Sequence, residues 1–130
     1  MSTERETFNA PDAPAAVGPY SHAASANGFV FASGQLGLSP DGSGLVPGGV
    51  EAQAVQALEN LQAVARAAGC ELADAVKVTV FLTDMGDFAS VNTIYANYFT
   101  GDEPPARAAV EVSDLPLGGL IEFEAVFAQR

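Results

Sequence analysis

Apolar residues recur with a helical period in the middle of the chain. Between residues 51 and 68 they return every three or four positions, which predicts an amphipathic helix with one apolar stripe. The stripe consists of Ala54, Leu58, Leu61, Ala65 and Ala68. Gly69 follows directly, and glycine is common just after a helix end. We therefore expect a helix over residues 51–68.

A second apolar stripe predicts a shorter helix that begins near Asp84 or Asp87. Either aspartate can cap it, because short acidic side chains accept hydrogen bonds from the free amides at a helix start. The stripe consists of Phe88, Val91, Tyr95 and either Tyr98 or Phe99.

Strict alternation of side chains predicts the strands. In residues 76–82 one face carries Val76, Val78, Val80 and Leu82, and the other carries Lys77, Thr79 and Phe81. Residues 21–26 and 29–33 predict a β-hairpin, because the Asn27-Gly28 pair between them favours the positive φ angles of a two-residue turn. A further turn is expected at residues 40–42, and a short strand near residues 7–8.

Two last strands are expected over residues 106–112 and 121–128, joined as a second hairpin through the loop 115–119. The order of elements predicts an α+β fold, a mixed sheet with two helices packed on one face. We expect a single domain over residues 1–130, with flexibility over residues 1–8. Phe29 and Phe31 alternate with Val30 and Ala32, so both sheet faces carry apolar groups. The face without helices is expected to pack against other subunits.

Composition narrows the classes of function. The 130-residue chain has a net charge of −11, which disfavours binding to nucleic acid because phosphate backbones require clustered cations. No apolar run of about 18 residues exists to span a membrane. The polar segment 1–7 does not resemble a secretory signal, so we expect a cytoplasmic location. The single cysteine, Cys70, predicts a packing residue near a helix end, and no Cys/His cluster predicts a zinc site.

The scarcity of cations draws attention to Arg107. The five cations are Arg5, Arg66, Lys77, Arg107 and Arg130. Two of the arginines are near the termini and Arg66 lies in the last turn of the expected helix, which leaves Arg107 at the start of a strand. Its planar guanidinium can bind a carboxylate through two parallel hydrogen bonds. The alternative is a structural ion pair with Glu122 or Glu111.

Glu122 and Glu124 are expected on one face of the last strand. A carboxylate next to a polarised carbon can hold and deprotonate a water molecule. The alternative is that both glutamates simply face solvent. His22 is the only histidine, so a Ser-His-Asp triad is disfavoured, and we interpret His22 as a strand residue or part of a pocket rim.

Short motifs in a fixed order resemble the RidA/YjgF/UK114 family over nearly the whole chain after about Asn9. They are Gly18-Pro19-Tyr20, Ser33-Gly34-Gln35, Gln53 with Leu58–Leu61, Lys77–Leu82, Val91-Asn92 with Tyr95, Pro105-Ala106-Arg107, and Ile121-Glu122-Phe123-Glu124. The resemblance implies a chorismate-mutase-like fold and a homotrimer with active sites at the subunit interfaces. It also implies a 2-iminobutanoate/2-iminopropanoate deaminase without a cofactor or metal of its own. Such an enzyme hydrolyses reactive enamines and imines to 2-keto acids and ammonia.

The resemblance also assigns roles to residues. Arg107 would bind the substrate carboxylate and Glu122 would position the attacking water, and these two are the expected catalytic residues. The expected substrate-binding residues are Tyr20, Ser33, Asn92, Arg107 and Ala109. Three positions depart from the family pattern. Ala109 replaces a common cysteine and leaves only its backbone carbonyl to hold water, His22 replaces a common glutamine, and Phe123 replaces a common Met or Ile. Two rival functions remain, a non-catalytic carboxylate-binding or chaperone-like role, and translation inhibition through RNA cleavage.

Overall fold

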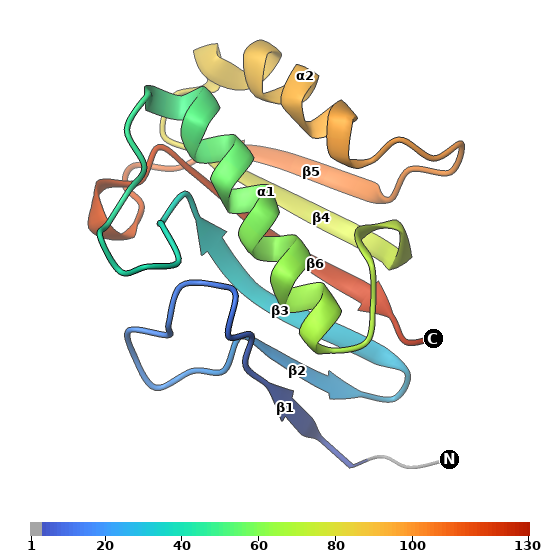
Figure 1. Cartoon of the computed structure of the whole chain (residues 1–130). Helices are drawn as coiled ribbons and strands as arrows, with labels where there is room; N and C mark the ends of the chain where they lie inside the picture. The colour runs from blue at the N-terminus through green and yellow to red at the C-terminus, as the bar shows by residue number, and fades with distance from the viewer. Residues whose placement is uncertain (1–3) are drawn as a thin grey trace.

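A six-stranded mixed sheet carries two helices on one face in the computed structural model, which describes residues 4–130 (Figure 1). The strands are β1 (Glu6–Phe8), β2 (Ala23–Ala26), β3 (Phe29–Leu36), β4 (Ala75–Leu82), β5 (Ala106–Glu111) and β6 (Ile121–Ala128). The helices are α1 (Gly49–Ala67) and α2 (Phe88–Tyr98), with short 3-10 helices η1 (Leu72–Asp74), η2 (Met85–Asp87) and η3 (Pro116–Gly118). The predicted α+β class is confirmed. The predicted flexible start falls partly on residues 1–3, which lie outside the described residues, whereas the expected strand near residues 7–8 is β1.

The first hairpin is confirmed together with its turn chemistry. Asn27 and Gly28 have φ angles of 52° and 86°, the left-handed region that a tight two-residue hairpin turn requires. Ala24 of β2 then pairs with Phe31 of β3.

The helix α1 packs its apolar stripe on β3 and β6, as Figure 1 shows for the long central helix. Leu58 and Leu61 are fully buried, and they belong to one hydrophobic cluster with Phe123 and Phe127 of β6. The helix ends before Gly69, whose φ of 81° lets the chain turn away. Asp84 caps η2 by accepting a hydrogen bond from the Gly86 amide at 2.8 Å, whereas Asp87 precedes α2 without a side-chain cap.

The expected second hairpin is wrong. Strands β5 and β6 do not pair, because β6 lies between β3 and β4 in the order β1-β2-β3-β6-β4-β5. Strand β5 instead pairs in parallel with β4, to which it is joined through α2. A parallel pair needs such a crossover helix, and this helix leads β5 to the outer edge of the sheet. The segment after β5 then crosses over β4, so that β6 is inserted between β3 and β4.

Val76 also differs from its predicted place on the buried face. Val78, Val80 and Leu82 are buried as expected, but Val76 is 45% exposed. The pairing with β6 shifts between Ala75 and Lys77, so that Val76 is an extra residue in a bulge. One inserted residue reverses the direction of the side chains before it.

The second face of the sheet has no helix over it in the described part of the chain. Phe29 and Phe31 of β3 are 42% and 51% exposed there, and Val110 at the edge strand β5 is 40% exposed. Within residues 4–130, no helix is both long and apolar enough to cross a membrane, and no group of acidic, histidine or cysteine side chains is arranged to hold a metal ion.

Candidate active site

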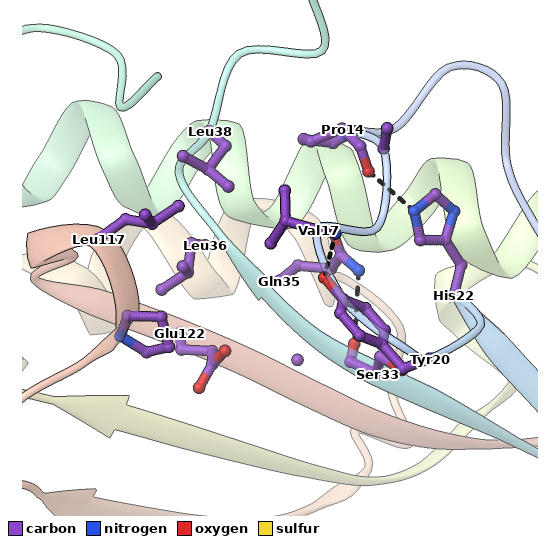
Figure 2. A pocket seen from close by; sticks show the side chains of 13 residues that line it. Pro14, Val17, Tyr20, His22, Ser33, Gln35, Leu36, Leu38, Leu117 and Glu122 are labelled. Carbon is purple, nitrogen blue, oxygen red and sulfur yellow. Dashed lines mark hydrogen bonds between the residues drawn. The ribbon is translucent and has the colours of Figure 1, made fainter. Parts of the chain in front are cut away.

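A cavity of about 360 Å³ opens between the N-terminal loop, the end of β3 and the start of β6. It brings together three of the predicted site residues, Tyr20, Ser33 and Glu122, and we call it the Glu122 pocket (Figure 2). Its remaining lining residues are Pro14, Ala15, Val17, His22, Gly34, Gln35, Leu36, Leu38, Pro116 and Leu117. The pocket therefore combines one carboxylate and two hydroxyl groups with a largely aliphatic wall.

A bulge in β3 places the chain next to Glu122. The pairing between β3 and β6 shifts between Ala32 and Gln35, so that Ser33 and Gly34 leave the regular ladder. A β-carbon on Gly34 would lie 2.6 Å from Oε2 of Glu122, which no ordinary contact allows. Glycine at this position thus leaves room for the carboxylate. The Ser33 hydroxyl donates a hydrogen bond to the Ser21 carbonyl at 2.7 Å, which orients its oxygen.

The Glu122 carboxylate is well placed to act as a base. It is half-buried, and burial followed by the nearby charge of Glu124 raises its pKa above the ordinary value. Neither of the ion pairs found among the described residues involves it. A raised pKa brings the carboxylate closer to the strength that general-base catalysis near neutral pH requires.

His22 ties the loop over residues 9–20 to the rest of the pocket. Its ring accepts a hydrogen bond from the Ala10 amide at Nδ1 (2.9 Å), so the ring proton is on Nε2, which donates to the Pro14 carbonyl (2.8 Å). The His22 backbone accepts from the Ser33 amide at 2.8 Å. His22 is only 3% exposed. It therefore holds the loop that carries Val17 and Tyr20 into the pocket.

Arg107 lies in a separate group of side chains on β5 and α2, the Arg107 cluster. Its Nη1 donates a hydrogen bond to Oδ1 of Asn92 at 2.6 Å. The guanidinium carbon lies 4.8 Å from the ring centroid of Tyr95 and 5.2 Å from that of Phe88. These contacts orient the cation while its side chain stays exposed to solvent. Ala109 lies two residues further along the same strand.

The Arg107 cluster and the Glu122 pocket lie on opposite faces of the sheet. Arg107 pairs with Val78, whose side chain is buried beneath the helices. Glu122 pairs with Phe81 and alternates with the buried Ile121 and Phe123, so it faces the other side. The structure therefore separates Arg107, Asn92 and Ala109 from Tyr20, Ser33 and Glu122 within one chain.

The alternative ion pairs for Arg107 do not occur among the described residues. The ion pairs there join Arg66 to Glu71 and Arg130 to Asp74. Glu111 accepts a hydrogen bond from the Met85 amide instead.

Sequence reasoning missed several residues of both groups. Phe88 and Tyr95 were predicted only as core residues, although the spacing of Phe88, Asn92 and Tyr95 puts them on one helix face towards β5. Leu117 was predicted only as part of a connecting loop. Its side chain shares the pocket with Leu36 and Leu38, a contact between distant segments that no local pattern indicates.

With this geometry in place, comparison with known proteins identifies the family. The family model described as Endoribonuclease L-PSP matches residues 10–129. The 2-iminobutanoate/2-iminopropanoate deaminase of Mus musculus is 49% identical over 125 residues, which cover 96% of this chain and 92% of the mouse protein. The chain belongs to the RidA/YjgF/UK114 family. The family prediction from the sequence motifs is thereby confirmed.

Two solved structures share the fold closely. RidA from a Psychrobacter species has a TM-score of 0.90 and 44% identity, covering 95% of this chain and 98% of the Psychrobacter chain. TdcF from E. coli, solved with bound serine, has a TM-score of 0.89 and 36% identity, covering 96% of this chain and 99% of TdcF. The likeness extends over almost the whole length of each chain.

Proposed function

We propose that the chain hydrolyses short 2-imino acids, and the enamines in equilibrium with them, to 2-keto acids and ammonia. The observation that carries this proposal is the Glu122 carboxylate, which lies in a pocket with its pKa raised by burial. The name of the mouse relative, which is similar over nearly the whole chain, supports the same activity. Serine bound to TdcF supports a site that accepts a small 2-substituted carboxylic acid.

In the proposed reaction, Glu122 accepts a proton from water while the water oxygen bonds to C2 of the imine. Proton transfer to the nitrogen then allows the C–N bond to break, so that ammonia leaves and the new C2 oxygen becomes the keto group. The rate acceleration would come mainly from positioning the water molecule and from general-base catalysis. Arg107 would bind the substrate carboxylate, oriented by Asn92. Tyr20, Ser33 and the Ala109 carbonyl would provide further polar contacts, and no step requires a cofactor.

A complete site would need two copies of the chain, because Arg107 and Glu122 lie on opposite faces of one sheet. We therefore propose a homotrimer of the chorismate-mutase-like type, with the exposed sheet face of Phe29 and Phe31 at the interface. Burying such side chains against another subunit removes apolar surface from water. Each site would combine the Glu122 pocket of one subunit with the Arg107 cluster of a neighbour.

Two observations disfavour RNA cleavage, the activity in the family model's description. The net charge of −11 repels a phosphate backbone. The single histidine uses both ring nitrogens in hydrogen bonds to the backbone, so it is not free to transfer protons.

Ammonia release tests the proposed function. An amino acid oxidase supplies the imine continuously, and the purified chain is expected to accelerate the release of keto acid and ammonia above the spontaneous rate. Binding of 2-keto acids without any acceleration would instead indicate the binding-only role. Sedimentation equilibrium is expected to give about three times the chain mass of 13.3 kDa. A monomer at micromolar concentration would contradict the shared site.

A further inference from the structure

The Glu122 pocket has an aliphatic wall next to its carboxylate. The wall consists of Val17, Leu36, Leu38 and Leu117, which come from three separate segments of the chain. In Figure 2, Leu36 and Leu117 lie nearest to Glu122, and Leu38 and Val17 lie further along the pocket. Leu36 is the strand partner of Glu122, so it is the aliphatic side chain directly beside the carboxylate. Tyr20, Ser33 and His22 lie toward the other end of the pocket.

Leu117 is held at this wall in a conformation that leucine rarely adopts. Its φ and ψ angles are 60° and 18°, in the left-handed region. Leu117 is 63% exposed, so it gains little from packing within its own chain. Strained backbone of this kind tends to occur at binding sites, where the surrounding structure maintains it. An exposed leucine at a pocket edge offers its methyl groups to a ligand.

We propose that this aliphatic wall binds the side chain of the substrate, and that the chain prefers 2-imino acids with a branched aliphatic side chain to 2-iminopropanoate. The inference rests on the proposed function. If Arg107 of a neighbouring subunit binds the carboxylate and Glu122 holds the water at C2, the remaining substituent on C2 is the side chain. The wall beside Glu122 is then the surface that this substituent meets.

The size and chemistry of the wall favour an alkyl group over a methyl group. The wall presents four aliphatic side chains, and the methyl group of 2-iminopropanoate can contact only part of them. Each additional methylene group buried against aliphatic side chains improves discrimination roughly fourfold. The imine formed from leucine carries three more carbon atoms than the imine formed from alanine. We therefore expect at least a tenfold preference for the leucine-derived imine, after some loss to incomplete burial.

The test compares imines generated in place from alanine and leucine by an amino acid oxidase. The expected result is a ratio of kcat/KM values, leucine-derived over alanine-derived, of about ten or more. In the variant Leu117→Asn this ratio is expected to fall at least threefold. Asparagine tolerates the left-handed conformation, so the substitution removes the aliphatic group without disturbing the backbone. The control Val55→Gln alters an exposed aliphatic residue of α1 outside the pocket and should leave the ratio unchanged.

The affinities for two unreactive keto acids, measured by calorimetry, test the side-chain preference independently of imine hydrolysis. We expect 4-methyl-2-oxopentanoate to bind at least tenfold more tightly than pyruvate, and Leu117→Asn to reduce that preference. A wild-type ratio near one, or an unchanged ratio in Leu117→Asn, overturns the inference even when imines are hydrolysed. Absence of imine hydrolysis with a retained binding preference overturns the deaminase proposal and supports the aliphatic wall.

Discussion

Arg107 and Glu122 project from opposite faces of one sheet. Their strand partners on β4 are Val78 and Phe81, and residues an odd number of positions apart on a strand point to opposite sides. Arg107 contacts α2 on the helical face, whereas Glu122 lines a pocket on the other face. One substrate can meet both side chains only if they come from different copies of the chain.

The shared site predicts that two inactive variants restore activity when they assemble together. The two variants, Arg107→Lys and Glu122→Gln, are co-expressed in equal amounts with different tags. At some interfaces, the intact Glu122 of an Arg107→Lys subunit then meets the intact Arg107 of a Glu122→Gln subunit. Random assembly gives about one quarter of the interfaces this combination, so mixed trimers should recover about a quarter of wild-type turnover. Mixed assemblies as inactive as the separate variants would show that the site does not cross between subunits.

The variant Arg107→Lys is expected to lose most of its catalytic activity, because it lacks the planar guanidinium group. Lysine keeps the positive charge but cannot form two parallel hydrogen bonds to a carboxylate, nor stack in the same way on Tyr95. We expect kcat/KM to fall by about 100-fold while the sedimentation profile stays the same. Arg66→Lys is the matched control, since Arg66 forms an exposed ion pair with Glu71. Near-normal turnover in Arg107→Lys would exclude bidentate binding.

The variant Glu122→Gln is expected to lose most of its turnover, because it lacks the catalytic base, but to keep its ligand binding. An amide can hold a water molecule but cannot accept its proton, so turnover should fall by about 100-fold or more. Affinity for pyruvate, measured by calorimetry, should change little because Arg107 provides that contact. Glu124→Gln on the same strand face is the control and should retain most of the turnover. If Glu122→Gln matched the wild type, Glu122 would only orient the substrate.

The raised pKa of Glu122 predicts opposite pH effects on activity and on stability. The base must be ionised, so kcat/KM should fall as the pH drops through the raised pKa, above the range of an ordinary glutamate. The folded state binds this proton more tightly than the unfolded state, so ionisation of Glu122 costs stability as the pH rises. Glu122→Gln should therefore raise the melting temperature at pH 7 but not at pH 4. An equal effect at both pH values would mean that burial does not perturb this carboxylate.

The contacts of His22 predict that its removal loosens the N-terminal loop. His22→Ala deletes one buried and one partly buried hydrogen bond and leaves the Ala10 amide without its acceptor, which should lower the free energy of unfolding by roughly 2–4 kcal/mol. Amide hydrogen exchange of residues 10–20 should accelerate. His22→Gln retains one donor and one acceptor and should lose less. Unchanged exchange in His22→Ala would show that other contacts hold the loop.

Much of the local structure could be predicted from the sequence because its causes lie within a few residues. The turn at Asn27-Gly28, the apolar stripe of α1 and the alternation in β4 and β6 depend on backbone preferences and side-chain period. The motifs around Tyr20, Arg107 and Glu122 likewise indicated the family without any knowledge of their positions in space.

Only the tertiary structure decided how these elements combine. Pairing β6 between β3 and β4, rather than with β5, depends on contacts between segments far apart in the chain, and the bulge at Val76 depends on the register with β6. The same long-range pairing sets the opposite directions of Arg107 and Glu122 and gathers Leu36 and Leu117 into one wall. Strand order and register depend on the burial and hydrogen bonding of the whole sheet, so a local pattern does not contain them.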